Sequence, residues 1–515
     1  MKPKTIESSE RDANTTSGLK TVSIIASTVL VGGIIFALTM IPTNNGVIDH
    51  APRTSSWVSE QTSARRIQAV CPAQMQLADT GSYGDTEFQS SAGNLTSRTR
   101  YAAFGSVFHS QVQALGPHQD ADATVLTGQS NNGDVMVSAS ADQQTTPTIF
   151  ETRLLSAKAG TGAAGALASY ATTGDLRGVS AASCVNTALE QTFLVPSTAT
   201  GHTNQLVISN PTDQPTTVTV QLWGAQSGRM ASATNSTLTV QAGGTTTMNL
   251  SAAAANQDAL WVDVISSDTA VACTIRMIDM DGLTPKGSDF AMPLDTAATT
   301  ATIPWTNSAT SIDLIARSSH AGSVKLSWIT THGLVAMHTL NLSEGKPVVW
   351  TPDDVPQHVI GISATSDVDF VIAARVNSAD HDGQTDFALV NGRTPMAQSA
   401  VALPADVTAN IAVANTDSQL ATIRFEGMDA AGAIIGSYTV SLDGNSAATF
   451  KASELGDDVV AVLVRQADAH IAWGAALTNT QVQHADLQGI AFLPATALHV
   501  PQQTMNAARN QSIIE

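Results

Sequence analysis

The stretch LVISNPTDQPTTVTVQLWG, residues 206–224, is typical of two β-strands with a turn between them. Leu206 and Ile208 lie two residues apart, so they point to the same face of a strand. Asn210 and Pro211 then interrupt the strand, as these residue types do at turns. The alternation resumes afterwards at Val218, Val220 and Leu222. Each strand is therefore predicted to turn one apolar face into a core.

The same pattern occurs three times along the chain. Apolar residues recur at an offset of 106 residues, and four of the five recur at an offset of 205 residues. Each copy then closes on an acid before an apolar strand, at Asp289, Asp386 and Asp486. The matched positions are Ile312, Leu314, Val324, Leu326 and Trp328 in the second copy, and Ile411, Val413, Ile423 and Phe425 in the third.

The period of about 100 residues decides the fold class. It is too long for a propeller blade or a solenoid turn, but it is the size of a β-sandwich domain. We therefore predict an all-β protein built from tandem immunoglobulin-like β-sandwich domains. Their predicted ranges are 187–296 (repeat 1), 297–396 (repeat 2) and 397–497 (repeat 3).

The repeats also decide how the three cysteines are interpreted. Cys273 aligns with Ile372 in repeat 2 and Trp473 in repeat 3, so this position is predicted to face the core. Cys273 is then a buried free thiol that packs as a small apolar side chain. The predicted disulfide joins Cys71 to Cys184, which requires an oxidising compartment outside the cytoplasm.

The N-terminal region predicts a membrane anchor. Residues 21–41 carry no charge, and a helix of this length spans the ~30 Å hydrocarbon layer of a bilayer. A transmembrane signal-anchor helix is favoured over a cleavable signal peptide, whose apolar region is usually shorter. Residues 1–20 are then a cytoplasmic tail and residues 42–70 a linker, with the bulk of the chain extracytoplasmic.

Two further segments are less regular. Residues 71–186 are predicted to form an N-terminal, mostly β domain, either a fourth, diverged sandwich or a distinct domain packed on repeat 1. Within it, GTGAAGALASYATTG (160–174) is low in complexity and is predicted to be flexible or helical. Residues 498–515 are expected to be a flexible tail.

The net charge and the sequence motifs argue against several classes of function. The formal net charge of −19 argues against nucleic acid as a partner, because phosphate binding needs a basic surface. GTGAAG matches the dinucleotide fingerprint, but no βαβ pattern surrounds it. Hydrolase motifs such as G-x-S-x-G and H-E-x-x-H do not occur in the sequence. We therefore predict no catalytic, cofactor-binding or metal-binding residue, and a protein that is not an enzyme.

Two sets of residues leave an alternative open. Asp279-x-Asp281-Gly282 and Asp380-x-Asp382-Gly383 are typical of hairpin turns, although paired carboxylates could also bind calcium. Trp328, Trp350 and Trp473 could stack on sugars, but all three align with core positions in other repeats, which favours packing.

GDLRGVSAASC (174–184), together with the NPTDQPTTVTVQLWG strand pair, resembles a family of actinobacterial envelope proteins. These proteins have an N-terminal membrane anchor and a domain of unknown function. The resemblance implies location and architecture, but no catalytic residue. Repeat 2 departs from the pattern with Ala316-Arg317 in place of Asn-Pro, and repeat 3 keeps only Asn415.

Three functions follow as hypotheses. The preferred one is a non-enzymatic, membrane-anchored extracytoplasmic scaffold or protein-interaction module of the cell envelope. It predicts an exposed apolar patch and no pocket of clustered acids. The alternative is a cell-wall glycan-binding module, which predicts an exposed aromatic side chain. A glycosidase, the third, predicts two carboxylates in one groove.

Overall fold

The computed structural model describes residues 57–78, 89–117, 122–131, 134–230, 237–306, 309–466, 468, 470–500 and 502–508. The chain divides into two compact units, one of residues 1–62 with 504–515 and the other of residues 63–503. The predicted membrane helix, 21–41, lies outside the described residues. Among those described, no helix has the length and apolar character needed to cross a membrane.

The strands extend closer to both ends of the chain than the sequence analysis predicted. Strand β1 (Trp57–Ser63) pairs with β37 (Gln502–Ala508) in a two-stranded sheet. Strand β2 (Arg66–Cys71) pairs with two other strands of the N-terminal module. The linker expected over 42–70 and the loose tail expected over 498–515 therefore contain strands instead.

The N-terminal module, residues 63–186, contains two five-stranded sheets in the orders β10-β9-β3-β7-β6 and β11-β2-β8-β4-β5. The strands are β3 (Thr96–Gly105), β4 (Val107–Ala114), β5 (Thr124–Val125), β6 (Thr127–Asn131), β7 (Asp134–Asp142), β8 (Thr148–Leu154), β9 (Gly162–Ala171), β10 (Gly178–Ser183) and β11 (Val185–Asn186). The stretch expected to be flexible or helical is mostly the buried strand β9. Its small side chains let β9 pack closely between neighbours, and this packing overrides the weak β-propensity of Ala and Gly.

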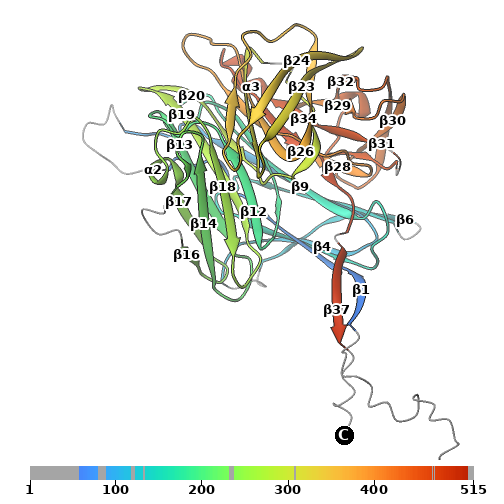
Figure 1. Cartoon of the computed structure of the whole chain (residues 1–515). Coiled ribbons are helices and arrows are strands. Elements are labelled where there is room, and N and C mark those ends of the chain that lie inside the picture. Colours follow the sequence, from blue (N-terminus) through green and yellow to red (C-terminus); the bar gives the residue numbers. More distant parts are fainter. Residues whose placement is uncertain are drawn as a thin grey trace, which may run out of the picture. The chain divides into compact units, whose positions relative to one another are not determined.

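Repeat 1 has two sheets, in the orders β12-β18-β14-β15, with β16 also paired to β14, and β17-β13-β19-β20 (Figure 1). The elements are β12 (Glu190–Val195), β13 (His202–Ser209), β14 (Thr216–Gly224), β15 (Gly228–Arg229), β16 (Thr237–Val240), β17 (Thr245–Asn249), α2 (Leu250–Ala253), β18 (Leu260–Ser266), β19 (Ala272–Asp281) and β20 (Thr284–Ala291).

Repeat 3 has the same plan, in the orders β31-β30-β33-β28-β36 and β32-β29-β34-β35. Its elements are β28 (Ser399–Ala402), β29 (Thr408–Asn415), β30 (Ala421–Met428), β31 (Ile434–Leu442), β32 (Ala447–Lys451), η2 (Ala452–Leu455), β33 (Ala461–Val464), β34 (Ile471–Thr478), α3 (Thr480–His484), β35 (Ala491–Pro494) and β36 (Thr496–Ala497). The structure is thus nearly all β, as predicted.

Repeat 2 joins its two layers through one long strand, β26 (Val359–Asn377). The first half of β26 pairs with β23 and the second half with β22, so it replaces two separate strands of the other repeats. The remaining strands are β21 (Ala298–Ile303), β22 (Ser311–Ser318), β23 (Gly322–Thr330), β24 (Gly333–Leu342), β25 (Val348–Trp350) and β27 (Phe387–Asn391).

The two strands of residues 206–224 belong to different sheets. β13 pairs with β17 and β19, whereas β14 pairs with β15, β16 and β18. The turn between them therefore carries the chain from one sheet to the other across the core. The buried side chain of Asn210 stabilises this corner. Asn210 Oδ1 accepts from Thr212 N at 3.0 Å, and Nδ2 donates to Gln214 O at 2.7 Å. Asn415 makes the corresponding bonds with the residues two and four positions later, at 3.0 and 2.8 Å.

The strand register corrects the alignment of repeat 2. Ile208 pairs with Cys273, and Ala316 pairs with Ile372, so the first strand is offset by 108 residues rather than 106. An error of two residues leaves every side chain on its own face, because the strand period is two. The counterpart of Asn210 is therefore Ser318, not Ala316. Its Oγ accepts from the backbone N–H two residues later at 3.1 Å, as the asparagines do.

The cores confirm that the matched positions are packing sites. Cys273, Ile372 and Trp473 are at most 1% exposed, and Cys273 is a buried free thiol as predicted. Apolar clusters also cross the repeat boundaries. Ile315 and Phe387 of repeat 2 belong to the core cluster of repeat 1. The core cluster of repeat 3 likewise includes side chains of the N-terminal module.

Candidate functional site

Four edge strands, one from each module, meet inside the second unit. β10, β20, β27 and β35 each lie at the edge of their own sheet or branch from it. β10 contacts β20 and β35, and β27 contacts the same two strands. The N-terminal module and the three repeats therefore form a closed cycle of contacts, and we call the meeting point of the four strands the hub.

Asp386 connects all four modules at the hub. Its side chain is fully buried. Oδ2 accepts from Val179 N at 2.9 Å and from Ile490 N at 3.0 Å. Oδ1 accepts from Phe387 N at 3.0 Å and from Ser288 N at 3.3 Å. One carboxyl group thus satisfies backbone donors from the N-terminal module and from every repeat, which would otherwise be buried without a partner.

Asp289 makes a second, smaller set of links. Oδ1 accepts from Ala181 N at 3.2 Å, and Oδ2 accepts from Leu389 N at 2.8 Å. Burial raises the pKa of Asp289 to about 7, although the backbone donors oppose this. Burial also raises the pKa of Asp386 well above its ordinary value, and the neighbouring Asp289 adds to that rise. Burial therefore raises the pKa of both groups, and the backbone donors that each carboxyl accepts oppose that rise.

Two glycines make room for Asp386. Gly178 and Gly287 have φ values of +125° and +114°, a backbone region that L side chains rarely adopt. A Cβ at Gly178 would lie 2.6 Å from Asp386 Oδ2, and one at Gly287 would lie 2.5 Å from Oδ1. Gly178 is the second glycine of the GDLRG stretch, so its close contact with Asp386 explains why this position of the motif is a glycine.

The third acid of the sequence pattern, Asp486, does not reach the hub. Its side chain is 89% exposed and lies 3.0 Å from His381 Nε2. The strand register explains the difference, because Ala291, Val390 and Leu493 occupy equivalent positions in the three repeats. The acids precede these positions by different numbers of residues. Sequence alignment therefore grouped three acids of which only two are buried together.

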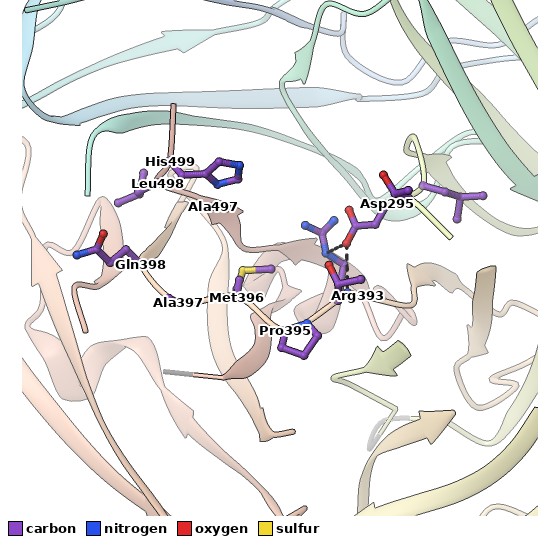
Figure 2. Close-up of a pocket in the computed structure, with 12 residues that line it drawn as sticks. Asp295, Arg393, Pro395, Met396, Ala397, Gln398, Ala497, Leu498 and His499 are labelled. Atoms are coloured by element: carbon purple, nitrogen blue, oxygen red, sulfur yellow. Dashed lines mark hydrogen bonds and ion pairs between the residues drawn. The ribbon is translucent and has the colours of Figure 1, made fainter. Parts of the chain in front are cut away.

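A cavity of about 630 Å³ lies where the linkers that follow the repeats come together (Figure 2). Residues 294–296, 393–398 and 497–499 line it. Arg393 Nε lies 3.2 Å from Asp295 Oδ2, and Arg393 Nη2 donates to Ala495 O at 3.3 Å. Thr394 N also donates to Asp295 Oδ2, at 3.3 Å. The ion pair between Arg393 and Asp295 therefore connects the linkers, and its two charges neutralise each other.

The cysteines predicted to pair, Cys71 and Cys184, are joined by a disulfide. Cys71 ends β2 and Cys184 follows β10, so the bond connects the two sheets of the N-terminal module. A Cβ at Gly165 of β9 would lie 2.2 Å from Cys184 Sγ, so glycine is required beside the bond.

The two Asp-Gly loops are turns of different character. Asp279 is buried, with Oδ1 2.8 Å from His202 Nδ1 and Oδ2 in an ion pair with Arg375 Nη1. In the other loop, Asp380 Oδ1 accepts from Gly383 N at 2.9 Å, which closes the turn. Within the described ranges, no group of three or more His, Cys, Asp or Glu side chains is placed to hold a metal ion.

The tryptophans mostly pack inside. Trp328 and Trp473 are at most 4% exposed, which confirms their interpretation as core residues. Trp350 is half-buried and stacks on His338, with ring centroids 4.5 Å apart. Trp305 is buried and stacks on Phe492 of repeat 3.

These features define an all-β protein in which successive modules are closed on one another through a buried polar hub. The chain belongs to the DUF5719 family, a family of unknown function whose model matches residues 135–453. No curated protein matches the sequence.

Two solved structures show slight similarity, both of the pilus adhesin SpaC from Lactobacillus rhamnosus GG. For the open conformation, sequence identity is 10% and the TM-score is 0.10, over 80% of this chain and 56% of that one. The second structure has 10% identity and a TM-score of 0.09, over 80% and 52%. The chain thus spans about half the length of the adhesin.

Proposed function

We propose that this protein is a non-enzymatic, membrane-anchored scaffold or protein-interaction module on the outer side of the cell membrane, of the actinobacterial type that its motifs resemble. The observation that carries the proposal is the Asp386 hub. A single buried carboxyl accepts backbone hydrogen bonds from four modules, so these modules hold one another in a fixed arrangement. Such an arrangement suits a body that presents contact surfaces at set distances.

The described surface offers apolar side chains for such contacts. Phe108 and Leu155 of the N-terminal module are 72% and 56% exposed. Leu334 and Val335, which are about half exposed, lie on β24 at the edge of the repeat 2 sheet. Exposed apolar side chains and unpaired edge strands are features on which protein partners dock.

The anchoring part of the proposal rests on residues 21–41, an uncharged segment as long as a bilayer-spanning helix. A tagged full-length chain should fractionate with membranes of its own host, and protease added to intact cells should degrade it. Deletion of 21–41 should move the chain into the soluble fraction. A full-length chain that is protected in intact cells, or that is soluble with the segment intact, would contradict the proposal.

The scaffold part needs a separate measurement. A photo-reactive amino acid at Phe108 or Val335 of the full-length chain should crosslink to a defined envelope protein in living cells. The same group at Asp486, which is also exposed but not apolar, provides the matched control. Crosslinking that is equal at all three positions, or absent from all three, would count against an apolar docking surface.

Binding of a cell-wall glycan is the second candidate function. The tryptophans of the three repeats do not support it, because all of them are buried or partly buried. They are Trp223, Trp261, Trp305, Trp328, Trp350 and Trp473. It is supported instead by a polar pocket between repeats 1 and 2, which a purely structural array does not require.

A further inference from the structure

A pocket of about 450 Å³ lies at the margin of the interface between repeats 1 and 2. His202 and Asp258 line it from repeat 1, and Asp313, Arg375 and Asn377 line it from repeat 2. Ile315 and Val349 add an apolar wall. Its volume is in the range of small-molecule sites, in which placed polar groups fix the orientation of the ligand.

Apart from the exposed Asp258, the polar side chains of the pocket form one connected network. Asp313 accepts from Thr351 Oγ1 at 2.7 Å and from Asn377 Nδ2 at 3.2 Å. Asn377 Oδ1 in turn accepts from Arg375 Nε at 2.8 Å. The Arg375 guanidinium pairs with Asp279, which also binds His202. Each side chain is held by its neighbour, so the groups that face the pocket are already oriented.

Packing of the modules does not require this network. Asp313 pairs with Arg375 across the sheet, and the equivalent pair in repeat 3 is Asn410 with Ala476. Ala476 packs in the apolar core cluster of repeat 2, so the interface between repeats 2 and 3 closes with a small apolar side chain there. The interface between repeats 1 and 2 opens a pocket lined with charges instead.

The charges indicate which ligand would fit. Two carboxyl groups, Asp258 and Asp313, line the pocket together with one guanidinium, Arg375, and Arg375 is already paired with the buried Asp279. Each Asp313 oxygen accepts one bond within the network, and a carboxylate oxygen can accept another. Asn377 Nδ2 already donates to Asp313 and to Ser311, so its amide oxygen is the group left for a ligand hydroxyl. The pocket therefore combines negatively charged acceptors with the Asn377 amide oxygen and the His202 imidazole.

We propose that this pocket binds a sugar unit that carries a free primary ammonium group, such as a deacetylated hexosamine of a glycan. Asp258 and Asp313 would receive the ammonium, Asn377 and His202 would bind hydroxyl groups, and Ile315 would contact the sugar ring. The inference rests on the glycan-binding alternative and names its substrate class; it does not depend on the scaffold role.

The test is calorimetric titration of the purified full-length chain in detergent with glucosamine, N-acetylglucosamine and glucose. Glucosamine should bind, and the two uncharged sugars should bind at least about tenfold more weakly, since each lacks the charge-assisted bond. Asp313→Asn and Asp258→Asn should each weaken glucosamine binding about tenfold. Asp354→Asn, which removes an exposed acid elsewhere in repeat 2, should leave it unchanged.

The outcomes separate two failures. Equal binding of all three sugars that still depends on Asp313 would keep a glycan site and overturn the ammonium assignment. Binding of none of them would overturn both. Hydrolysis of a nitrophenyl glucosaminide that is lost in the Asp313 variant would also overturn the inference, because the two acids would then be catalytic. Circular dichroism of each variant establishes that it is folded.

Discussion

Removal of the Asp386 carboxyl group should loosen the connection between the modules. In Asp386→Ala, four backbone donors lose their acceptor, and they belong to Val179, Ser288, Phe387 and Ile490. A buried donor without a partner costs about 1–3 kcal/mol. The low end of this range for four donors gives about 4 kcal/mol. Because the donors come from four modules, the free energy of local opening should fall at the hub before it falls within the core of any one module.

Amide hydrogen exchange followed by mass spectrometry measures this locally. A loss of about 4 kcal/mol corresponds to a decrease in protection of about a thousandfold. The decrease should appear in peptides that cover β10 and β35, whose neighbouring amides donate to Asp386. Peptides from β14 and β30, which belong to the sheets of repeats 1 and 3 that contain no hub strand, should change much less.

The matched control is Asp486→Asn, because the backbone φ of +59° at this position is one that Asn adopts readily and Ala does not. This acid occupies the corresponding place in the sequence pattern of repeat 3 but is 89% exposed, so removal of its charge should change stability by less than about 0.5 kcal/mol. The reasoning would be refuted if the Asp386 variant kept its β10 and β35 protection within about tenfold of the unmodified protein, or if both variants lost it equally.

Three further outcomes are expected from denaturant titrations. Burial raises the folded-state pKa of Asp289 to about 7 from an ordinary 3.8, so its stabilising contribution is complete below about pH 4 and is lost as the pH rises through 7. Asp289→Asn should flatten that decline, and an unchanged pH profile would contradict it. Replacement of Cys71 and Cys184 by Ala should cost about 4–5 kcal/mol on the chain-entropy model, since the bond spans 113 residues; a reduced unmodified protein should behave alike. Asn415→Ala should lower the free energy of unfolding by about 2 kcal/mol and Ser318→Ala by about 1 kcal/mol, because the asparagine side chain makes more hydrogen bonds at its corner than the serine does. The opposite order would argue against Ser318 as the counterpart of the corner asparagines.

The core of each repeat could be predicted because strands have a period of two. Alternation at Leu206 and Ile208 defines an inward face whatever the strand pairs with. That is why the alignment of repeat 2 placed the right faces inward even though its first strand was shifted by two residues. The buried position of Cys273 followed from its apolar equivalents in the other repeats.

Strand β9 and the hub could not be predicted in the same way. The Gly- and Ala-rich sequence of β9 has weak β-propensity, and only the neighbours that cover it make it a strand. Asp386 and Asp486 precede similar apolar strands, so local pattern does not separate a buried acid from an exposed one. Gly178 and the acids are visible in the sequence, but the contact between Gly178 and Asp386 joins strands that are about 200 residues apart. Their role at the hub therefore follows only from the way these strands pack.

The amino-acid sequence by itself determined that this chain is β throughout, that it repeats about every 100 residues, and which side chains enter each core. These properties are local, because they follow from alternation, turn residues and the number of residues in a sandwich. Tertiary structure alone decided that the repeats close on one another, that two of three similar acids are buried at their junction, and that one interface opens a charged pocket. These depend on the spacing of groups from different modules, and the free energy of burying a carboxyl is set by all the donors that surround it.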